Sequence, residues 1–174
     1  DYQFNGWGEK FLADADNQCT SQLKQARQLN CPVKSQTLVL EGGSIESDGD
    51  GSLLTTEHCL LSPKRNPHLD KQGIEQHLSA VMGIERFYWL SEGFLAGDDT
   101  DSHIDNLARF CNKQTIAYAS CDDPSDLHYD SLKAMQAQLA ALRDKDGHAY
   151  QLIDLPIPTA QYHQDERLPA SYVN

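Results

Sequence analysis

The sequence predicts an α/β fold made of repeated hairpin–helix–strand units. At two places, short β-prone stretches flank turn residues, and each pair is followed by an amphipathic helical pattern and a further β-prone stretch. The predicted helices begin near residues 70 and 130, and the closing strands begin near residues 86 and 149. A chain of 174 residues is long enough to bury a core of its own.

The first unit opens with a predicted β-hairpin. Leu38–Leu40 and Ser52–Thr55 are β-prone and flank Asp48–Gly51, whose Asp-Gly pairs are a hairpin signal. A helix follows with Asp70 as its N-cap, because apolar residues recur at i, i+4 and i+7: Ile74, Leu78 and Val81. Arg86–Leu90 is predicted as the closing strand.

The second unit repeats this order. Leu107–Cys111 and Thr115–Ser120 form the predicted hairpin, and Gly147 suits the exit of the helix that follows. That helix carries one apolar face: Leu132, Met135, Leu139 and Leu142. Ala149–Leu155 is the predicted closing strand.

An earlier helix is predicted from four residues on one face, and it would end a preceding unit: Cys19, Leu23, Ala26 and Leu29. The five cysteines are an odd number, and no pair has the spacing of a zinc site. We therefore expect reduced thiols in a cytoplasmic protein. Cys111 and Cys121 are expected to be buried core thiols, because they fall among predicted strands.

The charge of the chain excludes one class of partner. Lys and Arg number 14 against 26 Asp and Glu, for a net charge of −12. Nucleic acid is not expected, because its phosphates need Lys and Arg. Negative charge suits a cationic small molecule, although solubility alone also explains it. No apolar run approaches the roughly 20 residues of a membrane helix, so no membrane partner is expected. A homo-oligomer is compatible with the sequence.

Two segments carry residues suited to chemistry. Asp98–Asp105 holds four carboxylates and His103, and Glu41 follows the apolar run 38–40 directly. A histidine between carboxylates can hold a cation and move protons. An acidic loop by itself is more often a solvated turn. The other six histidines are assigned structural roles: His58, His68, His77, His128, His148 and His163.

Four motifs in order resemble those of one enzyme family. They are Phe4–Gly8, Glu41–Ser44 (Glu-Gly-Gly-Ser), Asp98–Asp105 (Asp-Asp-Thr-Asp-x-His-x-Asp) and Arg167–Asn174. Together they are similar to the agmatine deiminases, guanidine-modifying enzymes of the pentein superfamily that are grouped with the bacterial peptidylarginine deiminases. The resemblance covers almost the whole chain. Ser102 stands where the family usually has Gly.

The resemblance implies a pentein (α/β propeller) fold, in which ββαβ units surround a pseudo-fivefold axis. Residues 1–174 would then be a partial catalytic domain with two to two and a half units. The family's Arg-Asp motif is expected before position 1, and the Gly-rich His-Cys segment with the nucleophile is expected after position 174. The chain starts with Asp1 and ends after strand-like Tyr172–Val173, as a piece cut through structure would.

The resemblance also implies a reaction and its residues. Agmatine would be hydrolysed to N-carbamoylputrescine and ammonia through a cysteine amidino intermediate, as a step of putrescine biosynthesis, without metal or cofactor. His103 would be the general acid/base, and Glu41 would orient it. Asp99 and Asp105 would bind the guanidinium, and Trp7 would line the pocket. No cysteine of this chain is assigned as the nucleophile.

Three alternatives stay open. A metal-dependent hydrolase or metal-binding module could use the loop residues Asp99, Asp101, His103 and Asp105 as ligands. An EF-hand at Asp48 is excluded, because Leu53 and Cys59 occupy the positions that need Gly and Glu. The substrate could instead be free or peptidyl arginine. The chain could also belong to a pentein-like binding protein without catalysis.

Overall fold

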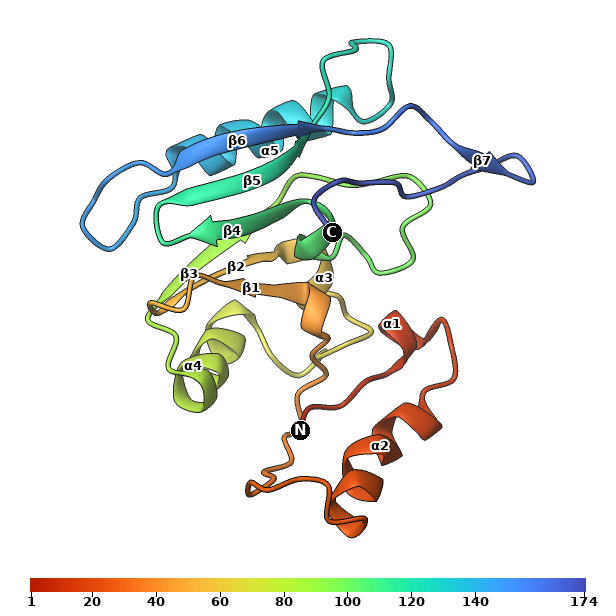
Figure 1. Ribbon diagram of the computed structural model, residues 1–174, viewed down its shortest axis with the longest axis vertical. Coiled ribbons are helices and arrows are strands. Elements are labelled where there is room, and N and C mark those ends of the chain that lie inside the picture. The colour runs from red at the N-terminus through yellow and green to blue at the C-terminus, as the bar shows by residue number, and fades with distance from the viewer.

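Two three-stranded sheets lie one above the other in the computed structural model, which describes residues 1–174 (Figure 1). The first sheet has the order β1-β2-β3, with bounds Ile45–Ser47, Ser52–Thr56 and Arg86–Leu90. β1 pairs antiparallel with β2, and β2 pairs parallel with β3. The chain is therefore a mixed α/β structure with small sheets.

The second sheet has the order β4-β5-β6, with bounds Ala108–Asn112, Thr115–Ser120 and Gln151–Pro156. Its pairing senses are the same as in the first sheet: antiparallel, then parallel. β1 and β4 are joined by the Glu46 carboxylate, which accepts the backbone N–H of Phe110 at 3.1 Å. The second predicted hairpin and both closing strands are confirmed to within two residues.

A helix connects the parallel strands of each sheet, because parallel strands require a crossover. In the first sheet α3 (Glu57–Leu60) and α4 (Lys71–Met82) fill the connection. The predicted N-cap is confirmed, since the Asp70 side chain accepts the N–H of Gly73 at 2.8 Å. Ile74 and Leu78 are fully buried, but Val81 is 45% exposed, so the predicted apolar face is shorter by one turn.

In the second sheet the connection is α5 (Tyr129–Ala141), which buries Leu132, Met135 and Leu139. Two details of the prediction are wrong. Leu142 is extended and lies beyond the helix, and Gly147 belongs to a separate turn in which its N–H bonds the carbonyl of Asp144. The left-handed φ of Gly147, +83°, serves that turn rather than the exit of the helix.

Each sheet packs its helix through its own apolar cluster. α4 covers the smaller cluster, which includes Leu38, Leu53 and Cys59. α5 covers the larger one, which also takes Leu54 and Leu90 from the first sheet. The larger cluster thus joins the two sheets. Cys121 is buried as predicted, whereas Cys111 on β4 is exposed, so that prediction is wrong.

The segment Leu38–Leu40 is not an arm of the first hairpin, contrary to the prediction. β1 fills that place, and Leu38–Leu40 forms only an isolated bridge between Val39 and Gln3. The side-chain amide of Asn66 supplies the missing partners, because it accepts from Val39 N at 3.0 Å and donates to Val39 O at 2.9 Å. The segment is nevertheless buried.

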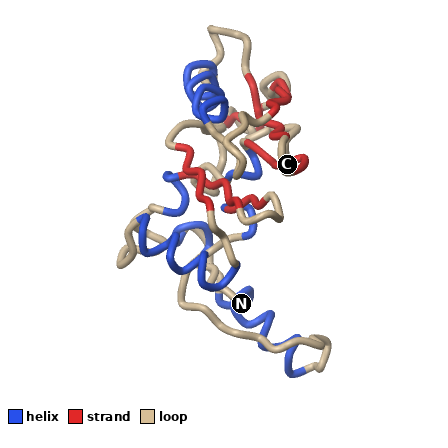
Figure 2. The backbone as a smooth tube through the Cα atoms, turned by 90° about the vertical axis from the view of Figure 1, so that its left-hand side faces the viewer, coloured by secondary structure: helices blue, strands red, loops and turns tan.

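The N-terminal part contains α1 (Gly6–Glu9), which lies near the acidic loop, and α2 (Asp14–Gln25), which extends away from the sheets (Figure 1 and Figure 2). The predicted helix is present, but Leu29 lies beyond it and no residue of α2 is buried. Cys19 and Leu23 lie on the helix as predicted, whereas Ala26 is its C-cap. No helix here is both long and apolar enough to cross a membrane.

The C-terminal hairpin, β7 (Tyr162–His163) and β8 (Glu166–Arg167), is tied to the start of α5. Arg167 Nη2 lies 2.8 Å from Asp126 Oδ2, and Asp126 Oδ1 lies 2.7 Å from Nδ1 of buried His128. The backbone N–H of Ala96 donates to His128 Nε2 at 2.9 Å. His128 is therefore a structural histidine, as predicted.

Candidate functional site

Glu41 is presented by a segment whose conformation is fixed on both sides. Leu40 before it is buried, and the short 3-10 turn η1 (Gly42–Ser44) follows it. The Ser44 hydroxyl donates back to the Glu41 carbonyl at 2.6 Å, and Thr55 Oγ1 on β2 donates to the Ser44 carbonyl at 2.7 Å. The Glu41 side chain is only 4% exposed, so its carboxylate needs partners inside the protein.

His103 is presented by the acidic loop, which is organised by its own first residue. The Asp98 carboxylate accepts Thr100 N at 2.9 Å and Ser102 N at 2.8 Å. Thr56 Oγ1, at the end of β2, donates to the Ser102 carbonyl at 2.7 Å. The loop therefore ends at a fixed point beside the first sheet, and η2 (Ile104–Asn106) follows it.

Ser102 adopts a backbone conformation that usually calls for glycine. Its φ is +62°, and that of Asp101 is +63°. L-residues rarely adopt this left-handed region, because Cβ comes too close to the backbone. The glycine that the resembled family usually has at this position would meet no such penalty.

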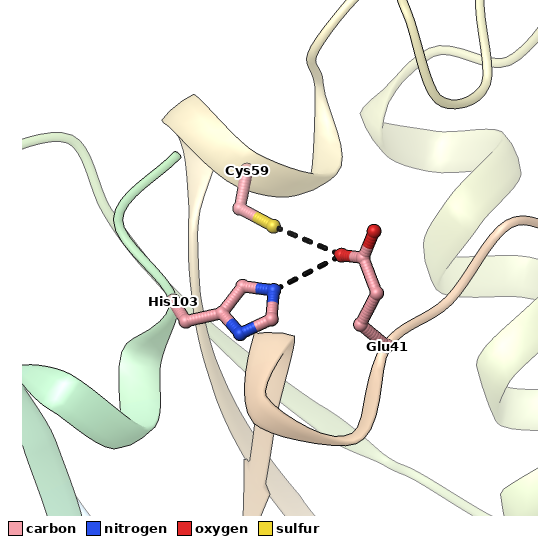
Figure 3. Close-up of side chains that lie close together, drawn as sticks. All are labelled: Glu41, Cys59 and His103. Carbon is pink, nitrogen blue, oxygen red and sulfur yellow. Dashed lines mark hydrogen bonds and ion pairs between the residues drawn. The ribbon is translucent and has the colours of Figure 1, made fainter. Parts of the chain in front are cut away.

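Glu41 and His103 meet although 62 residues separate them. His103 Nε2 lies 3.0 Å from Glu41 Oε2, and both side chains are buried (Figure 3). Gly43 is the reason that they fit, because a Cβ at this position would lie 2.5 Å from both His103 Nδ1 and Asp105 Oδ2. The Glu-Gly-Gly-Ser motif thus supplies both the carboxylate and the room for the histidine.

Two partners of Glu41 were not predicted from the sequence. Arg65 Nε lies 3.0 Å from Oε1 and 2.9 Å from Oε2, and the Cys59 thiol donates to Oε2 at 3.7 Å (Figure 3). Burial alone would raise the pKa of Glu41, but the hydrogen bond to His103 and the charge of Arg65 outweigh it, so the pKa is lowered. Glu41 is an ionised carboxylate held by three groups.

A cavity of about 560 Å³ lies beside this pair. Thr100, His103 and Asp105 line it from the acidic loop, and Trp7 lines it from α1, where sequence reasoning expected a pocket residue. Trp7 packs edge-on against Phe4, with ring centroids 5.7 Å apart. The full lining is Phe4, Trp7, Asp16, Leu40, Glu41, Gly42, Gly43, Thr100, His103, Asp105, Asn106 and Asn174.

Asp105 lines the cavity, and one of its two carboxylate oxygens has no partner. Its Oδ1 is buried and has no hydrogen-bond partner within the chain. Burial raises the pKa of Asp105, and the positive groups His103 and Arg109 only partly oppose that effect. A buried carboxylate oxygen without a donor costs free energy, and a cationic donor that reached this oxygen would remove that cost.

Asp99 and Asp101 do not join this group. Asp99 is exposed and does not line the cavity, and only its carbonyl is held, by Lys10 Nζ at 2.5 Å. Asp101 turns the other way and forms ion pairs with Arg65 at 2.7 Å and Lys10 at 2.6 Å.

The acidic loop is thus not arranged as the metal site of the alternative hypothesis. Asp99, Asp101 and Asp105 do not gather with His103 within ligand distance of one another. Around His103, the groups that do gather are Glu41 and Cys59, and a second cluster of Asp144, Asp146 and His148 lies outside the loop. Burial strongly raises the pKa of the Cys59 thiol, and Arg65 already neutralises Glu41, so this trio is a poor cation site. Cys59 also does not line the cavity, which agrees with leaving it out as a nucleophile.

Comparison with known proteins identifies relatives along the whole chain. The profile of the Porphyromonas-type peptidyl-arginine deiminase family matches residues 1–174. An agmatine deiminase of Medicago truncatula is 33% identical over 195 aligned residues, which cover 100% of this chain and 52% of that protein.

Solved structures share the fold as well. A C. jejuni agmatine deiminase variant with substrate bound is 43% identical, with a TM-score of 0.91 over 99% of this chain and 50% of the other. An Enterococcus faecalis agmatine deiminase is 28% identical, with a TM-score of 0.84 over 99% of this chain and 53% of the other. The chain spans about half the length of the relatives it matches.

Proposed function

Because the chain belongs to the Porphyromonas-type peptidyl-arginine deiminase family, we propose that it forms part of an agmatine deiminase-type hydrolase. The reaction would convert agmatine and water to N-carbamoylputrescine and ammonia, in the supply of putrescine. One observation carries the proposal. The buried Glu41–His103 pair and Asp105 line a single cavity, in a chain whose relatives are named agmatine deiminases.

The proposed roles follow from this geometry. The guanidinium of the substrate donates to the Asp105 carboxylate. Asp99 is a second guanidinium-binding carboxylate only by the family resemblance, because it does not line the cavity of this chain. His103 protonates the departing ammonia and then takes a proton from the attacking water. Glu41 holds the ring of His103 and stabilises its charged form. Trp7 forms one wall of the cavity beside the substrate.

The nucleophile in this proposal is a cysteine thiolate from the half of the relatives' length that this chain does not span. It attacks the central carbon of the guanidinium, and ammonia leaves with the proton from His103. Water then attacks the amidino thioether, and the thiolate departs as N-carbamoylputrescine forms. The Cys59 thiol is buried, away from the cavity, and is unsuited to this role.

The cavity favours agmatine over arginine. Its lining includes Glu41, Asp105 and Asp16 but no Lys or Arg. A substrate that is cationic at both ends suits such walls, whereas the carboxylate of free arginine would need a cationic partner. Peptidyl arginine stays the second candidate, because the family as described acts on it.

We further propose that the two sheets are ββαβ units of a pentein domain, with residues 1–174 as a partial domain. The support is their identical strand order and pairing sense, each with a helical crossover. The exposed α2 would then pack against the rest of that domain or against a second copy. The five free cysteines fit the reducing environment of a cytoplasm.

The test is an assay of the full-length protein with agmatine, peptidyl arginine and free arginine. We expect ammonia and N-carbamoylputrescine from agmatine, at the highest kcat/KM of the three, with a metal chelator present throughout. Loss of activity with chelator would support the metal-dependent alternative. A higher kcat/KM for peptidyl arginine would assign the second substrate class, and binding of agmatine without turnover would indicate a protein that has lost catalysis.

A further inference from the structure

Arg65 is a buried cation that the proposed mechanism does not use. Its side chain is fully buried, and it does not line the cavity. A buried guanidinium is costly unless its donors and its charge are matched. Its surroundings therefore indicate what it does.

Every nitrogen of the Arg65 guanidinium has a partner. Nε donates to both oxygens of Glu41, at 3.0 Å and 2.9 Å. Nη1 donates to Asp101 Oδ2 at 2.7 Å, and Nη2 donates to the Thr100 carbonyl at 2.9 Å. One side chain thus joins the segment that presents Glu41 to the loop that presents His103.

The next residue strengthens the same connection. Asn66 is also buried, at 3% exposed, and brackets the backbone of Val39, two residues before Glu41. Lys10 adds a second cation to the loop, through Asp101 at 2.6 Å and the Asp99 carbonyl. Residues 65–66 therefore hold Glu41 by its carboxylate and by the backbone that leads to it.

The charge of Arg65 matters as much as its position. Glu41 faces three groups that exchange or carry charge: Arg65, the Cys59 thiol and His103. Without a fixed cation, burial would favour the protonated form of Glu41. The carboxylate would take its proton either from solvent or from His103. With the cation, Glu41 stays ionised whether or not His103 is charged, which is what a general acid/base needs from its partner through a cycle.

We propose that Arg65 is a positioning residue for the acid/base pair: it holds Glu41 in place and charged, and it ties that carboxylate to the loop that carries His103. The inference rests on the proposed function for its kinetic consequence, but its electrostatic consequence can be measured without turnover. Asp101, which had no assigned role, is the anchor of Arg65 on the loop.

The kinetic experiment uses Arg65→Met and Arg65→Lys in the full-length protein with agmatine. Met keeps the volume and removes the charge, whereas Lys keeps the charge and loses the fork of donors. We expect kcat to fall about 10- to 100-fold in both variants, with KM changed much less. Arg86→Met is the matched control, because Arg86 bonds Ser52 and the Asp50 carbonyl, none of which lines the cavity.

A double-mutant cycle with Glu41→Gln separates positioning from general stability. If Arg65 acts through Glu41, adding Arg65→Met to Glu41→Gln should lower kcat/KM by far less than it does in the wild-type background. Full additivity of the two losses would overturn the proposal.

The electrostatic experiment is an NMR titration of the His103 ring. Removing a neighbouring positive charge raises the proton affinity of the pair, so the midpoint should move to higher pH in Arg65→Met, on the order of one unit, and stay near wild type in Arg65→Lys and Arg86→Met. If Arg65→Met does not fold, Asp101→Asn should still lower kcat with little change in KM.

An inactive wild-type protein would count against the proposed function only, and the titration would then decide the role of Arg65. If the midpoint of the His103 titration is the same in Arg65→Met as in the wild type, the proposed role of Arg65 is wrong.

Discussion

At the scale of single residues, the site depends on a carboxylate and a histidine that are both buried. Glu41 is 6% exposed and so is His103, and their contact is 3.0 Å long. Water competes weakly for such a pair, so the hydrogen bond and the charge interaction are stronger than on the surface. Substitutions that keep the shape but remove one function should therefore separate chemistry from folding.

The first prediction concerns this pair. His103→Ala and Glu41→Gln in the full-length protein should each lower turnover of agmatine by about two to four orders of magnitude, the usual span for a general acid/base. Steady-state ammonia release measures it, and thermal unfolding checks that the fold is kept. Ammonia release at the wild-type rate by His103→Ala would remove this residue from the mechanism.

The second prediction concerns the unpaired oxygen of Asp105. Asp105→Asn keeps the size of the side chain and removes the charge of a carboxylate that lines the cavity. It should weaken binding or transition-state stabilisation of a guanidinium by about 1.5–3 kcal/mol. An uncharged urea analogue of the substrate is the control ligand, and it should lose much less affinity. Equal losses for the two ligands would show that Asp105 does not recognise charge.

At the scale of elements, the loop that carries His103 combines strong anchoring with backbone strain. Asp98 bonds two backbone N–H groups of the loop, while Ser102 is left-handed at φ +62°. Other elements are ordinary by comparison, such as α4, which begins at a side-chain cap and ends at a left-handed glycine. Strain of this kind persists where surrounding contacts determine it.

The third prediction follows from that strain. Ser102→Gly should raise the free energy of unfolding by up to about 1 kcal/mol, because glycine removes the left-handed penalty while adding some unfolded-state entropy. The matched control is Ser79→Gly, on the exposed side of α4. This change should lower the free energy of unfolding by roughly 0.5–1 kcal/mol. Urea denaturation measures both. Destabilisation by Ser102→Gly would mean that the serine side chain matters more than the backbone.

The fourth prediction concerns the pH dependence of stability at the contact between α5 and the C-terminal hairpin. Burial lowers the pKa of His128 below its usual 6.5, although the hydrogen bond to Asp126 opposes this. The folded state therefore binds fewer protons than the unfolded state near that pH, and stability falls as the pH decreases through about 6.5. In His128→Gln, the urea unfolding midpoint should change less between pH 5 and pH 7.5 than it does in the wild type. If the midpoint changes with pH as much as in the wild type, His128 is not the source of the pH dependence.

At the scale of the whole molecule, the candidate site is lined by residues from α1, from the segment of Glu41 and from the acidic loop. Glu41, Asp105 and Trp7 line an open cavity, and α2 buries none of its residues. The chain spans about half the length of its relatives. In the proposed mechanism, Glu41, His103 and Asp105 position a guanidinium but cannot cleave it without a nucleophile.

The fifth prediction is that the 174-residue chain alone releases no ammonia from agmatine above background and forms no amidino adduct by intact mass. The full-length protein should do both, because it would add the cysteine. Turnover by the 174-residue chain alone would contradict the assignment of the nucleophile to the other half.

The sequence by itself determined the local elements and the outline of the site. Period and turn signals located α4, α5, the second hairpin and both closing strands, because these depend on residues close in the chain. The motifs singled out Glu41, His103 and Asp105, and the structure brings these three residues to one cavity.

Only the tertiary structure decided the contacts between distant segments. No local pattern marks Arg65 or Cys59 as a partner of Glu41, since these contacts span 24 and 18 residues. Leu38–Leu40 has strand-like residues, yet the side chain of Asn66 accepts the backbone N–H of Val39. The strand that pairs with β2 is β1 instead. Cys111 lies in a strand as predicted, but its exposure depends on which face the helix covers. Side-chain burial and charge pairing are properties of the assembled fold, and a sequence period reports only the local backbone.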